Sequence, residues 1–399
     1  MPCTVGGDES QKPRQLLLVL CTLLVLCFLY NSIWRLHLWG LGHKPLYDKH
    51  GFLAKLDYYV TLEHLTPTPK ESCRSGYAAE KMTTIYPWFI KPAPMFLDMN
   101  YRALSQIRNF YLPFGTKRQE WILDYILKVT NNYGLGEEFN SLSCKKCIVV
   151  GNGGILTNKS MGVRIDAYDL IVRLNNAPVR GYEKDVGSRT TMRITYPEGA
   201  FQNPELYETD SLFVLSAFKS SDFQWLRSMI FKRRMYNVEM FWKSVAQHIP
   251  REPGDMRILN PYFIQEAAFK LIGLPRYNEQ NIPTLGAVAI TMALHNCDEV
   301  DVAGFGYDMG KPHAPLHYYE NTRMAAMNES STHNICQEKE FLIKLLKEGV
   351  IRDLTNGILR ELIVGGINGV ENAFRAKSGG MMHCRCDVAI STTIRTSSS

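Results

Sequence analysis

A series of apolar strands, each followed by a turn with polar residues, between positions 144 and 198 constrains this chain most. Residues 147–150 are typical of a buried parallel strand, and the glycines of 151–154 let the backbone turn sharply and approach a ligand closely. Asn152 and Asn175 each follow a strand, and open α/β sheets bind ligands at the carboxyl ends of their strands. The pattern predicts that both amides line one crevice, with a plain tight turn as the alternative reading of the glycines.

Short apolar strands alternate with helical segments through the rest of the chain, which predicts a single α/β domain built on a parallel sheet. Further strands are expected at 170–174, 190–194, 212–215, 257–259 and 300–303. Helices are expected at 118–131, 222–231, 261–272, 287–295 and 337–347.

The amino-terminal region predicts a membrane anchor. Residues 16–34 are almost uninterruptedly apolar and long enough to cross a bilayer as a helix. Lys12 and Arg14 precede them, so the positive-inside rule predicts a cytoplasmic tail at 1–15 and a lumenal remainder. A cleaved secretory signal is the alternative, but no small-residue cleavage pattern follows. We expect a proline-containing stem at 35–90 and a folded lumenal domain at 91–358.

Cysteine usage and charge restrict the ligands. In an oxidising lumen, Cys73, Cys144, Cys147 and Cys297 are better explained as disulfide partners than as zinc ligands, because no second Cys-x-x-Cys completes a zinc site. The net charge of +6 is spread along the chain without a nucleic-acid-binding module, so no nucleic-acid partner is expected. This mild basicity suits an anionic small-molecule substrate, or is merely the ordinary solvated surface.

A second glycine-bearing turn opens a long apolar helix near position 285. Thr284 and the amides around Gly286 lie at the positive end of that helix and could hold a phosphate or a carboxylate. A capped core helix without a ligand is the alternative. No Asp-x-Asp pair is present to hold a divalent ion, so we expect neither a metal nor a cofactor.

Two histidines follow the last expected strand. Unperturbed imidazole titrates near neutrality, so His317 or His333 could accept a proton from a hydroxyl that attacks an electrophile. Glu338 lies five positions after His333 and could orient its ring. A structural role for either histidine is the alternative reading.

Four motifs, in the same order, resemble those of eukaryotic sialyltransferases over residues 92–358. The run from Cys147 to Asn175 resembles the large sialyl motif, and residues 283–300 resemble the small one. His317-Tyr-Tyr-Glu resembles the third motif, and the pair His333 and Glu338 fits the very small motif. Within the family, the chain is most similar to alpha-2,3-sialyltransferases acting on N-acetyllactosamine, with the lactosylceramide enzymes as close competitors.

The resemblance implies a Rossmann-like parallel sheet flanked by helices, the GT-A variant of sialyltransferases. It implies inverting, metal-independent transfer of N-acetylneuraminic acid from CMP-N-acetylneuraminate to the 3-hydroxyl of terminal galactose. The implied acceptors are Gal-beta-1,3-GlcNAc or Gal-beta-1,4-GlcNAc ends of glycoproteins and glycolipids. His333 would be the base and His317 would contact the departing phosphate. The residues implied to bind the donor are Asn152, Gly153, Asn175, Thr284, Gly286, Tyr318 and Glu338.

The same resemblance implies two disulfides, Cys147–Cys297 and Cys73–Cys144, and a single-pass type II protein of the Golgi membrane, and it leaves a homodimer open. Residues 359–399 resemble nothing in the family and are expected to be disordered. Two other classes compete. A nicotinamide or flavin oxidoreductase would need the Gly-x-Gly-x-x-Gly register, which the turn lacks. A membrane-tethered sugar-binding module would bind sialylated product without turnover.

Overall fold

The structure, a computed structural model, describes residues 73–359 apart from 237, 277–281, 309 and 330–331. The predicted cytoplasmic tail, the membrane anchor at 16–34, most of the stem and the tail from 360 onward lie outside the described residues. Within the described part, no helix is both long and apolar enough to span a bilayer.

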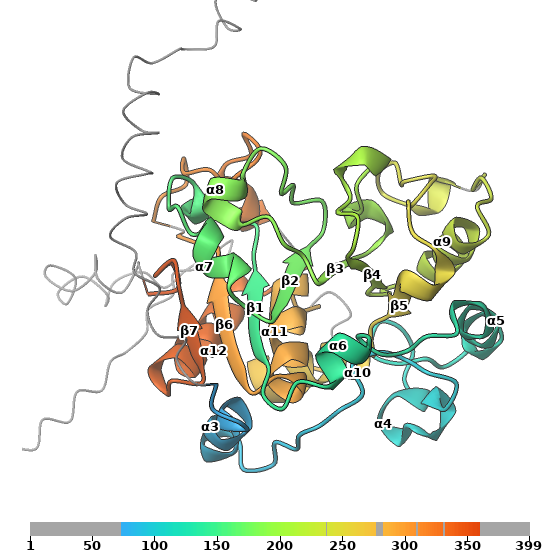
Figure 1. Ribbon diagram of the computed structural model, residues 1–399, viewed down its shortest axis with the longest axis horizontal. Helices are drawn as coiled ribbons and strands as arrows, with labels where there is room; N and C mark the ends of the chain where they lie inside the picture. Colours follow the sequence, from blue (N-terminus) through green and yellow to red (C-terminus); the bar gives the residue numbers. More distant parts are fainter. Residues whose placement is uncertain (1–72, 237, 277–281, 309, 330–331, 360–399) are drawn as a thin grey trace, which may run out of the picture. The chain divides into compact units, whose positions relative to one another are not determined.

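Seven strands of the described chain form one parallel sheet in the order β5-β4-β3-β2-β1-β6-β7 (Figure 1). The strands are β1 Lys146–Val150, β2 Leu170–Leu174, β3 Met192–Thr195, β4 Leu212–Leu215, β5 Met256–Ile258, β6 Glu299–Ala303 and β7 Ile351–Asp353. Six of them match the predicted strands, and β7 was not predicted. Strands β2 to β5 lie in sequence order on one side of β1, and β6 and β7 lie on its other side. The topological switch point therefore lies between β1 and β6.

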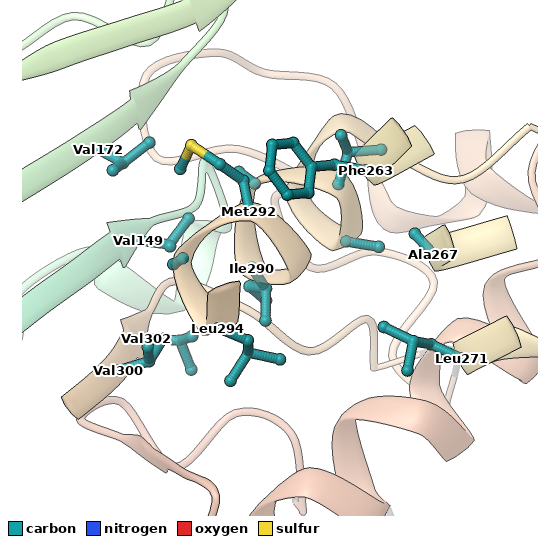
Figure 2. Close-up of a cluster of buried hydrophobic side chains, with 14 of the residues drawn as sticks. Val149, Val172, Phe263, Ala267, Leu271, Ile290, Met292, Leu294, Val300 and Val302 are labelled. Atoms are coloured by element: carbon teal, nitrogen blue, oxygen red, sulfur yellow. The ribbon is translucent and has the colours of Figure 1, made fainter. Parts of the chain in front are cut away.

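Helix α11 (Leu285–Asn296) covers one face of the sheet and lies in the core between that face and α10 (Tyr262–Glu266). It is buried nearly all round, which explains why its sequence is apolar without a polar stripe. Figure 2 shows Met292 and Leu294 of α11 facing the valines of β1, β2 and β6, while Phe263 lies on the opposite side of the helix. Helices α3 (Tyr77–Ile85) and α12 (Ile335–Lys347) complete this layer.

The opposite face of the sheet is covered by two separate groups of helices (Figure 1). Ile148 and Val150 of β1 pack toward α7 (Gly162–Asp166) and α8 (Glu183–Val186), since successive strand residues point to opposite faces. Phe213 and Leu215 of β4 pack instead with α5 (Glu120–Thr130) and α9 (Ser220–Ile230). The α/β fold with helices on both faces is thus as predicted.

Helix α10 (Tyr262–Glu266) does not continue as the regular helix predicted for 261–272. It passes directly into a π-helix, Ala267–Ile272, which ends at Gly273 in the left-handed region, φ 83°. Apolar periodicity cannot distinguish these two windings over so short a segment. The remaining short helices are α4 Ser105–Arg108, α6 Glu137–Asn140 and the 3-10 turns Tyr101–Ala103, Gly154–Leu156, Pro197–Gly199, Pro204–Leu206, Val238–Met240, Pro253–Asp255 and Met324–Glu329.

Both expected disulfides are present, Cys147–Cys297 and Cys73–Cys144. The first joins β1 to the residue that ends α11, and both of its side chains are buried. The second ties the segment before α3 to the segment before β1. Ala78 and Met82 of α3 are completely buried in the core. The folded domain therefore begins before residue 91, and the expected stem at 35–90 is too long at its carboxyl end.

Candidate functional site

Two glycine turns meet at the switch point between β1 and β6. The amide of Gly151 donates to the Ala303 carbonyl at 2.8 Å, and the amide of Gly153 donates to the Gly304 carbonyl at 3.0 Å. A Cβ on either Gly151 or Gly153 would lie 2.6 Å from the Gly304 oxygen, which no real side chain tolerates. These glycines are required because two backbone segments pack against each other here.

A cavity of about 800 Å³ opens along the carboxyl edge of the sheet from these turns. Its wall combines the segments that follow β1, β2, β3, β4 and β6 with the amino end of α11 and the first turns of α12. Eight of the predicted site residues line it: Asn152, Gly153, Asn175, Thr284, Gly286, His317, His333 and Glu338. The sheet topology thus brings together residues that are far apart in sequence, as the pattern of strands predicted.

The two asparagines offer amide groups to the cavity. The Oδ1 atom of Asn152 is buried without a hydrogen-bond partner among the described residues, and its Nδ2 lies 3.4 Å from the Tyr319 hydroxyl. Asn175 has a left-handed backbone, φ 52°, which asparagine tolerates better than most residues. The Thr195 hydroxyl lies 3.4 Å from its Oδ1. Both amides therefore keep capacity for a ligand.

Arg193 of β3 holds the turn that carries Asn175, and sequence reasoning missed it. Its Nη1 donates to the carbonyls of Asn175 at 2.8 Å and Ala177 at 3.0 Å. The guanidinium is 1% exposed and pairs with the carboxylate of Glu208. Burial acts to raise the pKa of Glu208, but the charge and the hydrogen bond of Arg193, together with a backbone hydrogen bond and the charge of Arg173, leave that pKa below its usual value. Arg193 thus positions the turn that carries Asn175. This role can be recognised only from the folded structure, which brings the two together.

His333 is held as a neutral imidazole with one free nitrogen. Its Nδ1 lies 2.7 Å from the Ile282 carbonyl oxygen, which can only accept a hydrogen bond. This bond assigns the proton to Nδ1 and leaves the lone pair on Nε2. Burial lowers the pKa of His333 below its ordinary value, although the bond to Ile282 acts in the other direction. The ring is therefore uncharged near neutral pH and can accept a proton at Nε2.

Glu338 does not orient the His333 ring, so that expectation is wrong. Its carboxylate accepts instead from the Thr284 amide at 2.7 Å and from the Thr284 hydroxyl at 2.6 Å. The Thr284 hydroxyl in turn accepts from the Ala287 amide at 3.2 Å and caps α11. Burial raises the pKa of Glu338 to about 7. Glu338 therefore links the start of α12 to the start of α11 at the cavity wall.

His317 pairs with Gly153 of the first glycine turn in an isolated antiparallel bridge. Its Nδ1 bonds the carboxylate of Glu320, and its ring stacks on Tyr319 with centroids 5.4 Å apart and planes 7° apart. The carboxylate and the stacked ring fix the imidazole, and Nε2 is the nitrogen left for a ligand.

Tyr318 is the exception among the predicted binding residues. Its side chain does not line the cavity, because its hydroxyl donates to the Pro178 carbonyl at 2.7 Å and its ring packs on Tyr182. The Tyr318 amide donates to the Asn152 carbonyl at 3.1 Å. The structure therefore does not place Tyr318, predicted to bind the donor, on the cavity wall, and its amide instead holds the Asn152 turn.

Asp353, at the end of β7, holds the loop that supplies the carboxyl-terminal part of the cavity wall. Its carboxylate accepts four hydrogen bonds, from the amide and hydroxyl of Thr355 and from the amides of Gly357 and Ile358. Gly357 and Ile358 line the cavity. Gly357 also packs on Gly306, where an added Cβ would lie 2.4 Å from the Gly357 backbone. Sequence reasoning missed both β7 and this loop.

The arrangement combines a neutral base, a second fixed histidine, two amides and the amino end of α11 around one cavity. Such a set can bind an anionic, amide-recognised ligand and remove a proton from a hydroxyl beside it. These are the groups that a group-transfer enzyme requires.

Comparison with known proteins identifies the class. The model of glycosyltransferase family 29 (sialyltransferase) matches residues 96–350, and the chain belongs to this family.

Among curated relatives, the mouse and human proteins named CMP-N-acetylneuraminate-beta-1,4-galactoside alpha-2,3-sialyltransferase are each 57% identical to this chain. Each match covers 86% of the chain and 97% of the relative. Human lactosylceramide alpha-2,3-sialyltransferase is 36% identical, with 88% of this chain and 86% of the relative covered. A solved structure, a mammalian sialyltransferase, superposes with a TM-score of 0.52 at 25% identity, covering 67% of this chain and 91% of its own.

Proposed function

We propose that this chain is a beta-galactoside alpha-2,3-sialyltransferase. It transfers N-acetylneuraminic acid from CMP-N-acetylneuraminate to the 3-hydroxyl of terminal galactose in Gal-beta-1,4-GlcNAc or Gal-beta-1,3-GlcNAc. Membership of the family and 57% identity to relatives named for that reaction on beta-1,4-galactosides support the proposal. The lower identity, 36%, to a lactosylceramide enzyme makes that acceptor the second candidate.

The observation that carries the proposal is the hydrogen bond from His333 to the Ile282 carbonyl. It makes Nε2 the basic atom of a neutral ring on the cavity wall. In the proposed reaction, Nε2 takes the proton of the galactose 3-hydroxyl as that oxygen attacks the anomeric carbon of the donor. The new bond forms on the face opposite the departing CMP, so the anomeric configuration inverts.

The leaving group departs as the CMP anion and keeps the electron pair of the broken carbon–oxygen bond. His317, fixed by Glu320, is proposed to contact its phosphate. Asn152, Gly153 and Asn175 are proposed to hold the nucleotide, and Thr284 and Gly286 lie at the amino end of α11 where an anion is favoured. With a stable leaving anion and one base, the scheme requires no metal.

We further propose a type II protein of the Golgi membrane, with the folded domain in the lumen. The apolar stretch 16–34 behind Lys12 and Arg14 supports this topology. The two disulfides support an oxidising compartment, because such bonds are rare in the cytosol. A homodimer is compatible with the proposal.

The decisive experiment compares wild-type full-length protein with His333→Ala. Transfer from CMP-N-acetylneuraminate to N-acetyllactosamine is expected to fall by about 10²–10⁴-fold, the usual contribution of a general base. Calorimetry should show a Kd for CMP within about twofold of wild type, well below the tenfold change that a loss of about 1.4 kcal/mol would cause. The reason is that His333 is proposed to act on the acceptor hydroxyl and not on the nucleotide.

His248→Ala is the matched control, since His248 is exposed and does not line the cavity. It should leave transfer and CMP binding unchanged. Unchanged transfer in His333→Ala would show that the base is another group. Linkage analysis of the product is expected to give the alpha-2,3 bond, and a different linkage would contradict the assigned acceptor hydroxyl.

A further inference from the structure

The cavity continues beyond the glycine turns to the carboxyl ends of β3 and β4. The residues that line this region are Tyr196, Glu198, Phe218, Lys219 and Trp242. None of them belongs to the nucleotide-binding turns at β1 and β6. The cavity therefore has a second end, several strands along the sheet from the switch point.

The floor of this second end is polar and rigid. Glu198 is completely buried and accepts from Lys219 Nζ at 3.0 Å. Lys219 Nζ also donates to Asp222 at 2.7 Å, and Asp222 accepts from the Phe218 amide at 2.8 Å. Carboxyl and amine groups held in fixed positions can exchange hydrogen bonds with the hydroxyls of a ligand.

The walls are aromatic. Tyr196 and Phe218 meet edge to face, with centroids 5.5 Å apart and planes at 84°. Trp242 is 72% exposed although it lines the cavity, so its indole stands at the rim. Lys243 Nζ lies 5.1 Å from the centre of the Trp242 ring. Large aromatic side chains with one wet face are typical of sites that bind amphipathic ligands, and sugars carry such faces.

We propose that Trp242 determines acceptor specificity by contacting the sugar that carries the terminal galactose. The inference rests on the proposed function and deepens it. A terminal galactose that reaches the reacting groups must sit in the depth of the cavity, with its hydroxyls toward the buried Glu198 and Lys219. The next sugar of the acceptor then lies at the rim, where Trp242 is the large exposed side chain of this end of the cavity. The apolar face of that sugar ring would then stack on the Trp242 indole.

The test compares a disaccharide with a monosaccharide acceptor in the full-length protein. In Trp242→Ala, the KM for N-acetyllactosamine is expected to rise about tenfold, which corresponds to a contact of about 1.4 kcal/mol. The kcat/KM for methyl beta-galactoside, the KM for CMP-N-acetylneuraminate and the rate of donor hydrolysis should each stay within about twofold. Trp242→Phe should restore most of the disaccharide affinity, because it keeps an aromatic face.

Trp121→Ala is the matched control, since Trp121 is 63% exposed on α5 and does not line the cavity. It should change none of these quantities. An equal loss with both acceptors, a loss of donor affinity, or no loss at all in Trp242→Ala would overturn the inference while leaving the proposed function intact. Absence of transfer to any galactoside by the wild type would instead overturn the proposed function, and the inference with it.

Discussion

Replacing Glu338 with glutamine is expected to stabilise the folded protein at high pH and to leave its stability unchanged at low pH. Glu338 is 4% exposed, and burial raises its pKa from 4.5 to about 7, even though two hydrogen bonds from Thr284 favour the charged form. The folded state therefore keeps a proton over a pH range in which the unfolded state has lost it. Stability from this group is fully present below pH 4.5 and is lost as the pH rises through about 7.

The magnitude follows from the two pKa values. Each pKa unit is worth about 1.4 kcal/mol, so the shift from 4.5 to about 7 corresponds to roughly 3 kcal/mol of unfolding free energy at pH 8. Glutamine has the shape of the protonated acid and cannot ionise. The free energy of unfolding of Glu338→Gln minus that of wild type should be a little under about 1 kcal/mol at pH 5 and approach about 3 kcal/mol at pH 8.

Urea unfolding of the full-length chain, followed by tryptophan fluorescence between pH 5 and pH 8, measures this difference. His333 has a lowered pKa and shifts stability in the opposite direction, but it titrates in both proteins and cancels in the difference. Glu340→Gln is the control, because Glu340 lies exposed on the same helix and should give a flat difference. A flat or falling difference for Glu338→Gln would refute the reasoning.

Two further changes probe the frame of the cavity. The double variant Cys147→Ala, Cys297→Ala removes a crosslink across 150 residues and is expected to lower the free energy of unfolding by up to about 5 kcal/mol, measured by urea unfolding without reductant. A loss below about 1 kcal/mol would contradict the loop-entropy argument. Asp353→Asn is expected to cost about 3 kcal/mol and to weaken CMP binding in calorimetry, because an amide nitrogen would face donors that now bond a carboxylate. Wild-type stability together with wild-type CMP affinity would show that the charge is not needed there.

The strands and the glycine turns could be predicted because their signals are local. Ile148 and Val150 alternate with residues of the other face, and the glycines at 151 and 153 mark a close backbone approach. Strand β7 was not predicted, because it has only three residues and its middle one, Arg352, is exposed. Strand β5 is equally short, but all three of its residues are buried and the buried Leu259 follows it, so its apolar signal is stronger.

The roles of individual side chains could be predicted only in part. His333 and Glu338 are five residues apart in the sequence, which suggested that Glu338 orients the His333 ring. The fold directs Glu338 to Thr284 and gives His333 the Ile282 carbonyl. Arg193 acts through tertiary contacts that no spacing in the sequence reveals.

The position of the cavity at the switch point between β1 and β6 has a consequence for biosynthesis. The wall of the cavity includes Gly151, near the start of the sheet, and Ile358, beyond its last strand. A growing chain that has completed β1 to β5 lacks the wall residues between Ile282 and Ile358, including His333, which we propose as the base. The wall of the cavity is therefore complete only after residue 358 has been synthesised.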